Sequence, residues 1–153
     1  IAFGSQQGHI ESVECLRDGE KTKFYNKEEL ITIKIVSEVD ETVKNPKMLF
    51  ILQDTKKYNI YGIRSDETIQ WEFSENNRKK ATMYFQFKAS LVPGEYSVTL
   101  ALQDYKSANI TTLIERQTHA VDFVIVSKGL EEIYGVVDLK ATCSNSIVNK
   151  QEA

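Results

Sequence analysis

The sequence predicts an all-β fold, an antiparallel sandwich of about nine or ten strands. Apolar and polar residues alternate with a period of two in many short segments, which is the pattern of strands with one buried face. Turn residues separate these segments at roughly 8–12-residue intervals, which is typical of a sandwich. No long segment has the periodicity of an amphipathic helix.

The expected strands follow one another along the whole chain. Alternating segments occupy residues 30–36, 69–73, 81–88, 96–102, 121–125 and 137–140. Residues 48–52 are continuously apolar, as in a strand that is covered on both faces. Turn residues lie at positions 17–20, 45–46, 54–57, 74–78 and 92–95. Residues 105–117 have a weaker pattern and are expected to form a polar loop with one more strand near residues 110–114.

A chain of 153 residues fits a single domain. We expect residues 1–8 to be the remnant of a linker, residues 9–142 to form the sandwich, and residues 143–153 to be a flexible tail. The formal net charge of −3 argues against binding to nucleic acid, which needs many basic contacts to phosphate. Neither a signal peptide nor a transmembrane segment is recognisable, and an initiator Met is absent, so a fragment of a longer chain is expected.

The usual catalytic motifs are absent. The sequence has no phosphate-binding glycine loop, no G-x-S-x-G elbow and no C-x-x-C pair. His9 and His119 lack metal-ligand spacing. Carboxylate pairs occur at residues 28–29, 66–67 and 131–132, but adjacent residues on a strand point to opposite faces, so these pairs do not suit a glycosidase. We therefore predict no catalytic residue, no metal site and no cofactor.

Aromatic and planar polar side chains gather in one stretch of the chain. They are Tyr58, Asn59, Tyr61, Arg64 and Trp71. A sugar ring needs a flat aromatic or apolar surface below its C–H face and amide, hydroxyl or guanidinium groups around its hydroxyls. This composition therefore suggests a glycan-binding surface. The alternative is that Trp71 and one tyrosine belong to the core.

Three further positions carry specific expectations. If Met48, Phe50 and Leu52 face the core, then Leu49 and Ile51 face outward, as they would in an interface or a groove. The alternative is that a loop of the same chain covers them. Tyr96, which begins a strand after residues 93–95, is expected to be a corner or core tyrosine.

Several motifs occur in an order that is similar to a known family. These motifs are HIESVECL at 9–16, DG at 18–19, YNKEEL at 25–30, NP at 45–46, FILQD at 50–54, IYG at 60–62, FQFKASLVPGEYSV at 85–98, VDFVI at 121–125 and YGVVDL at 134–139. Over about 130 residues the chain resembles the C-terminal carbohydrate-binding domain of the ATP-binding subunit of bacterial polysaccharide ABC transporters, the Wzt type that exports O antigen.

The resemblance implies a non-catalytic, immunoglobulin-like sandwich that recognises the exported polysaccharide, at its non-reducing terminus. It implies an upstream nucleotide-binding domain, a transmembrane permease as partner, and a location at the cytoplasmic face of the bacterial inner membrane. It also implies a homodimer that exchanges a C-terminal strand, for which residues 133–141 are suited. The expected interface residues are Leu49, Ile51, Val137 and Leu139.

We expect the binding face on a sheet formed by residues 48–53, 59–63, 96–103 and 121–126. Its outward ligand residues would be Gln53, Asn59, Tyr61, Thr99 and Gln103, with Arg64 and Trp71 at the rim. Tyr84, Gln86 and Lys88 lie on the opposite sheet in this arrangement and are reserve candidates. The alternative function is a structural or adhesion sandwich that binds protein partners through a sheet edge or through Leu49 and Ile51.

Overall fold

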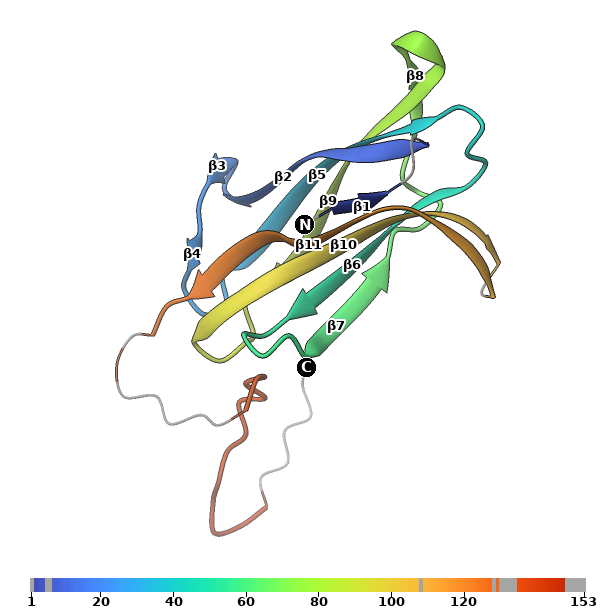
Figure 1. Cartoon of the computed structure of the whole chain (residues 1–153). Coiled ribbons are helices and arrows are strands. Elements are labelled where there is room, and N and C mark those ends of the chain that lie inside the picture. Colours follow the sequence, from blue (N-terminus) through green and yellow to red (C-terminus); the bar gives the residue numbers. More distant parts are fainter. Residues whose placement is uncertain (1, 5–6, 108, 128, 130–134, 148–153) are drawn as a thin grey trace.

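Two β-sheets stacked face to face make up the fold (Figure 1). The computed structural model describes the backbone of residues 2–4 and the whole of residues 7–107, 109–127, 129 and 135–147. Eleven strands and one short 3-10 helix lie in these ranges. Within them, no helix has the length and apolar character needed to cross a membrane. The predicted all-β antiparallel sandwich is therefore confirmed.

The larger sheet has six strands and carries the candidate site. Its order is β1-β11-β10-β6-β7, and β4 pairs in parallel with β11. The strands are β1 (Ala2–Gly4), β4 (Phe24–Tyr25), β6 (Pro46–Gln53), β7 (Asn59–Arg64), β10 (Gly94–Ser107) and β11 (Ile110–Ile125). The four segments that the sequence assigns to one sheet all belong here, as β6, β7, β10 and β11.

The second sheet has five strands in the order β3-β2-β5-β9-β8. They are β2 (Gly8–Arg17), β3 (Glu20–Lys21), β5 (Leu30–Asp40), β8 (Glu72–Ser74) and β9 (Arg78–Lys88), and the 3-10 helix η1 (Glu75–Asn77) joins the last two. The described strands outnumber the predicted nine or ten because β1, β3 and β4 have only two or three residues each, while β8 overlaps the predicted segment 69–73. Such short strands leave no periodicity in the sequence.

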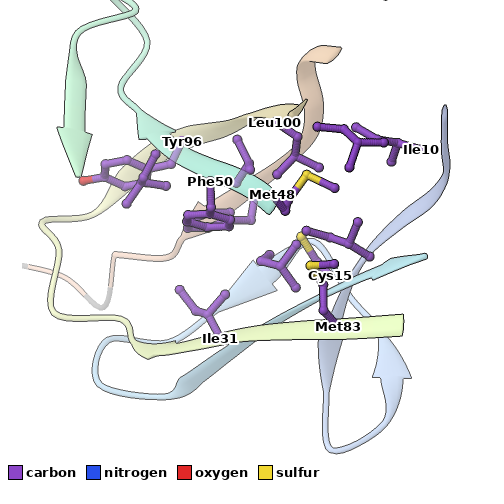
Figure 2. Close-up of a cluster of buried hydrophobic side chains, with 14 of the residues drawn as sticks. Ile10, Cys15, Ile31, Met48, Phe50, Met83, Tyr96 and Leu100 are labelled. Carbon is purple, nitrogen blue, oxygen red and sulfur yellow. The ribbon is translucent and has the colours of Figure 1, made fainter. Parts of the chain in front are cut away.

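The core lies between the sheets and consists of the alternating apolar residues (Figure 2). Ile31, Ile33 and Ile35 of β5 are fully buried, as the alternation predicts. Opposite them, Phe50 of β6 stacks on Phe85 of β9 with ring centroids 4.7 Å apart. These contacts join the two sheets, so the outer surface of each sheet is left for other roles.

Tyr96 belongs to the core at the start of β10, as expected. Its ring stacks on Phe123 at 5.7 Å, and its hydroxyl donates a hydrogen bond of 2.6 Å to the carbonyl of Val92. Burial, and secondarily the charge of Asp54, raises the pKa of this tyrosine to about 12. Tyr96 therefore fixes the turn before β10 from the inside.

Strands β10 and β11 form a longer hairpin than the sequence predicts. Residues 105–117 are expected to be mostly loop, yet β10 runs to Ser107 and β11 begins at Ile110, with Tyr105 paired to Thr111. Thr111 and Leu113 are exposed. Because this end of the hairpin is exposed to solvent, its sequence lacks the alternation of apolar and polar residues by which strands are recognised.

The two ends of the chain differ in how they compare with the expected domain limits. Residues 2–4, expected in a linker, form β1 and pair with β11. Toward the other end, the segment 135–140 runs beside residues 88–92, where Val137 makes an isolated antiparallel bridge to Leu91. Residues 143–147 lie in no strand and are exposed. Most of the expected tail, residues 148–153, falls outside the described residues.

Candidate functional site

The outer face of the six-stranded sheet, turned away from the other sheet, collects most of the predicted ligand residues. The strand register shows which residues belong to this face, because residues directly opposite each other on neighbouring strands point to the same side of the sheet. Strand β6 pairs with β10 through Leu49–Ala101, Ile51–Thr99 and Gln53–Ser97. The outer face therefore includes Leu49, Ile51, Gln53, Asn59, Gly62, Arg64, Ser97, Thr99, Ala101, Gln103, Arg116 and Asp122.

A chain of hydrogen bonds crosses three strands on this face. The Thr99 hydroxyl donates to Oε1 of Gln53 at 2.8 Å, and Nε2 of Gln53 donates to Oδ1 of Asn59 at 3.0 Å. Thr99 is 6% exposed, whereas Asn59 is exposed to solvent. The chain therefore holds the Gln53 amide in one orientation and leaves the Asn59 amide donors facing solvent.

A second polar group lies farther along the same face. Nε of Arg64 donates to Oε1 of Gln103 at 3.2 Å, and the guanidinium lies over the Tyr105 ring, 4.7 Å from its centroid. These two contacts fix the plane of the guanidinium, which presents several donors in a rigid fork. Arg64 is thus held ready to donate hydrogen bonds to a ligand on this face.

Apolar residues form the floor between these polar groups. Leu49 and Ile51 point outward and are half-buried, as the sequence predicts, and Ala101 beside Leu49 is buried. On β7 the floor continues at Gly62, where a Cβ atom would lie 3.9 Å from Ile51 Cγ1, an ordinary contact. Glycine is therefore not required by the space here, and its absent side chain keeps this edge of the floor low.

A pocket of about 500 Å³ lies at one end of the outer face, next to Gln53. Its walls come from four separate segments and include Phe24, Asp54, Ser97, His119 and Asp122. We call it the end pocket. Sequence reasoning missed it, since no local pattern links residues so far apart in the chain.

Two features of the end pocket are unusual. Ser97 is 5% exposed, and its hydroxyl has no hydrogen-bond partner among the described residues. His119 has a left-handed backbone, with φ of 53°, in the irregular stretch where three residues of β11 lie opposite Thr99. Its Nδ1 is 3.6 Å from Oδ1 of Asp122. A buried hydroxyl without a partner is costly. Ser37 in the interior has such a hydroxyl too, whereas Ser97 belongs to the lining of the end pocket.

Tyr61, expected among the outward ligand residues, lies on the other side of the sheet. The pairing of Gln53 with Asn59 is followed by Leu52 with Tyr61, so Ile60 is an extra residue in β7. A bulge of one residue exchanges the faces of all following side chains. Tyr61 consequently shares a face with Leu52 and lines an inner cavity with Phe87 and Val137, although it is 53% exposed at the sheet edge.

Trp71 is also absent from the outer face. Its side chain is half-buried and packs against the hydrophobic core, which is the alternative that the sequence left open. The strand that follows it, β8, pairs with β9 of the other sheet, so this segment has already left the six-stranded sheet. The reserve candidates Tyr84, Gln86 and Lys88 lie on β9 and are exposed there, as expected.

The described part of the C-terminal segment, residues 135–147, is not found over Leu49 and Ile51. Val137 lies on the inner side of β7, whereas Leu139 is 84% exposed. Two ion pairs hold the segment, between Lys27 and Asp138 and between Lys140 and Glu28, the latter at 2.9 Å.

These ion pairs also affect the acidity of the carboxyl groups. The hydrogen bond from Lys27 lowers the pKa of Asp138, and that from Lys140 lowers the pKa of Glu28.

One group of potential metal-binding side chains occurs among the described residues. His9, Glu11 and Glu38 bring their ligand atoms within 4.8 Å of one another on the five-stranded sheet. Lys80 already pairs with Glu11, at 3.2 Å. This group lies on a different sheet from the outer face and contributes nothing to it.

Comparison with known proteins agrees with the resemblance seen in the sequence. A family model of the Wzt C-terminal domain matches residues 1–139. The crystal structure of the C-terminal domain of Wzt has a TM-score of 0.78 with this chain at 13% identity, covering 95% of this chain and 88% of that one, which supports the fold. No curated protein gives a significant match. Since the family model covers most of the sequence, the chain belongs to the family of Wzt C-terminal domains, non-catalytic domains of ABC-transporter subunits for polysaccharide export.

Proposed function

We propose that the outer face of the six-stranded sheet binds the polysaccharide that the transporter exports. The observation that carries this proposal is the pair of preorganised polar groups, Gln53 with Asn59 and Arg64 with Gln103, on either side of an apolar floor. A sugar ring presents a C–H face to Leu49 and Ile51 and directs its hydroxyls to the flanking amides and guanidinium. Such an open face suits a chain of linked sugars.

Binding at one such face is weak and depends on several contacts. Each net hydrogen bond contributes about 0.5–1.5 kcal/mol. Preorganisation helps because the side chains lose little freedom when the ligand arrives. Selective recognition of the O-antigen polysaccharide, at its non-reducing terminus, is the form of this function that we favour.

A binding assay with purified glycans tests the proposal. A panel of bacterial O-polysaccharides is immobilised, and binding of the purified chain is measured by biolayer interferometry. Gln53→Ala, Asn59→Ala and Gln103→Ala are each expected to weaken binding by about 2- to 12-fold, the equivalent of one hydrogen bond. Gln86→Ala, a matched glutamine on the opposite sheet, serves as the control.

Two results would contradict this assignment. The first is binding to no member of the panel. The second is a response in which Gln86→Ala weakens binding while the three outer-face variants retain it, because the ligand would then sit on the five-stranded sheet. Retained folding of every variant is checked by circular dichroism.

We further propose that two copies of the chain act together. In a homodimer the segment 135–140 would be exchanged, so that Val137 and Leu139 contact the partner's surface and the pairs formed by Asp138 and Lys140 are made between chains. The ion pairs and the isolated bridge that hold this segment could equally be made with a second copy, which supports the exchange. Two faces on one assembly would raise the apparent affinity for a long glycan through effective concentration. Light scattering after size exclusion tests this, and a monomeric mass at every concentration would overturn it.

The remaining partners follow from the family. The proposed full protein carries a nucleotide-binding domain before this chain and works with a transmembrane permease at the cytoplasmic face of the inner membrane. In that setting, glycan binding by this domain would select which polysaccharide the transporter moves. The sequence of the natural gene upstream of Ile1 checks this, since a P-loop ATPase is expected there.

A further inference from the structure

The end pocket differs in chemistry from the open part of the outer face. Three carboxylate side chains line it, those of Asp54, Glu95 and Asp122, against the single ammonium of Lys23. The open part of the face carries Arg64 and Arg116 instead. A ligand in the end pocket therefore experiences a more negative electrostatic potential than a ligand that lies only on the open part of the face.

An aromatic wall and a buried hydroxyl complete the pocket. Phe24 pairs with Val124 at the sheet margin, and its ring is 55% exposed. The Ser97 hydroxyl, without a partner among the described residues, belongs to the same lining. Asp122, its cross-strand neighbour, has a side chain that is 62% exposed and lies on the same face as Ser97.

We infer that the end pocket holds one sugar unit of the glycan, stacked on Phe24 and hydrogen-bonded to Ser97 and Asp122, and that it accepts neutral or amino-bearing units and rejects acidic ones. The inference rests on the proposed function and adds a specificity-determining subsite to it. An exposed aromatic ring suits the apolar face of a sugar, and a carboxylate accepts hydrogen bonds from neighbouring hydroxyls. The volume is within the range of small-ligand pockets.

The carboxylates determine the selectivity. An acidic sugar placed here would bring its negative charge close to Asp122 and Asp54. Two unit charges 4 Å apart in water interact by about 1 kcal/mol, and more where water is excluded, so discrimination of at least about fivefold is expected. An ammonium substituent would be attracted by the same groups.

Simple glycosides serve as probes in a nuclear magnetic resonance titration. Methyl glycosides of the gluco, galacto and manno series are compared in neutral, 2-amino and uronic acid forms, with the amide signals of Phe24, Ser97 and Asp122 as the readout. We expect shifts at these amides with at least one neutral or amino glycoside and none, or at least fivefold weaker affinity, with its uronic partner.

Two variants and two matched controls separate the roles of the residues. Ser97→Ala should lower the affinity for the bound glycoside by about 2- to 12-fold, which corresponds to the loss of one net hydrogen bond. Asp122→Asn should reduce the discrimination against the uronic form. Ser37→Ala, at a buried serine that faces the interior, and Asp18→Asn, at the β2–β3 turn outside the pocket lining, should leave affinity and discrimination unchanged.

The inference is overturned if no glycoside shifts the pocket amides, if neutral and uronic forms bind equally, or if Ser97→Ala leaves the affinity unchanged. These failures are distinguishable from failure of the proposed function. If O-polysaccharides bind and respond to Gln53→Ala but not to Ser97→Ala, only the subsite is wrong. If glycosides occupy the pocket but no polysaccharide binds, the subsite stands and the proposed export ligand is wrong.

Discussion

Replacing Thr99 by Val tests whether the polar chain on the outer face is preorganised. The substitution keeps the shape of the side chain and removes the donor that holds Oε1 of Gln53 at 2.8 Å. Gln53 is half-buried, so water replaces the lost bond in part. The free energy of unfolding should fall by about 0.5–1.5 kcal/mol, the net value of one hydrogen bond. For a domain of this size that corresponds to a fall in Tm of about 1–6 °C.

The assay combines thermal unfolding with glycan binding. Calorimetry gives the Tm of wild type, Thr99→Val, Gln53→Ala and the double variant, and the four values form a double-mutant cycle. If Thr99 and Gln53 act as one unit, the second substitution should lower the Tm much less when the first is already present. O-polysaccharide binding should weaken in Thr99→Val although Thr99 itself is 6% exposed.

The control is Thr82→Val, at an exposed threonine on β9, which should leave Tm and binding near their wild-type values. The reasoning is refuted if Thr99→Val melts at or above the wild-type Tm, or if the two substitutions are additive. Either result would mean that the bond from Thr99 to Gln53 does not restrain the amide.

Three further predictions concern the core and the charged groups. Phe123 is 1% exposed and packs between Tyr25 and Tyr96. Phe123→Ala should therefore lower the free energy of unfolding, measured by urea titration, by about 3–5 kcal/mol. A loss below about 1.5 kcal/mol would contradict this packing. Burial raises the pKa of the Cys15 thiol from 9.0 to about 12. The contribution of this thiol to the free energy of unfolding is therefore complete below pH 9 and is lost as the pH rises from 9 to 12. Cys15→Ala should delay the fall of the urea midpoint at alkaline pH, and an unchanged pH profile would argue against this role of Cys15. The pKa values of Asp138 and Glu28 are lowered from 3.8 and 4.5 by Lys27 and Lys140, so their contribution is present above about pH 4.5 and is lost as the pH falls through the lowered values. Asp138→Asn should therefore speed tryptic cleavage after Lys140 at neutral pH, while Asp18→Asn should not, and equal rates would show that the ion pair does not anchor the segment.

The sequence predicted the core and the main sheet well because both depend on local periodicity. In β5, Ile31, Ile33 and Ile35 all face inward, as the two-residue alternation requires. Alternation also placed Gln53, Thr99 and Gln103 on one outward face. Once the strands were assigned to one sheet, their outward residues were determined by geometry alone.

The errors have specific physical causes. Alternation assumes an unbroken ladder, so the extra residue Ile60 made the expected placement of Tyr61 wrong. The end pocket is lined by Phe24, Ser97 and Asp122, which are distant in the chain and share no local pattern. Trp71 was ambiguous because a large aromatic side chain suits a core and a sugar surface equally well.

The bulge at Ile60 also bears on how specificity can change within such a family. Loss of this one residue would restore the simple ladder, but Tyr61 would still lie opposite Leu52 and Gly62 opposite Ile51, so neither side chain would change face. The pairing of β7 with β6 thus determines the outer face, and the bulge accommodates one extra residue without changing that pairing. A substitution at Gly62, where an added Cβ would make only ordinary contacts, is therefore a more direct way to place a new side chain on the outer face than loss of Ile60.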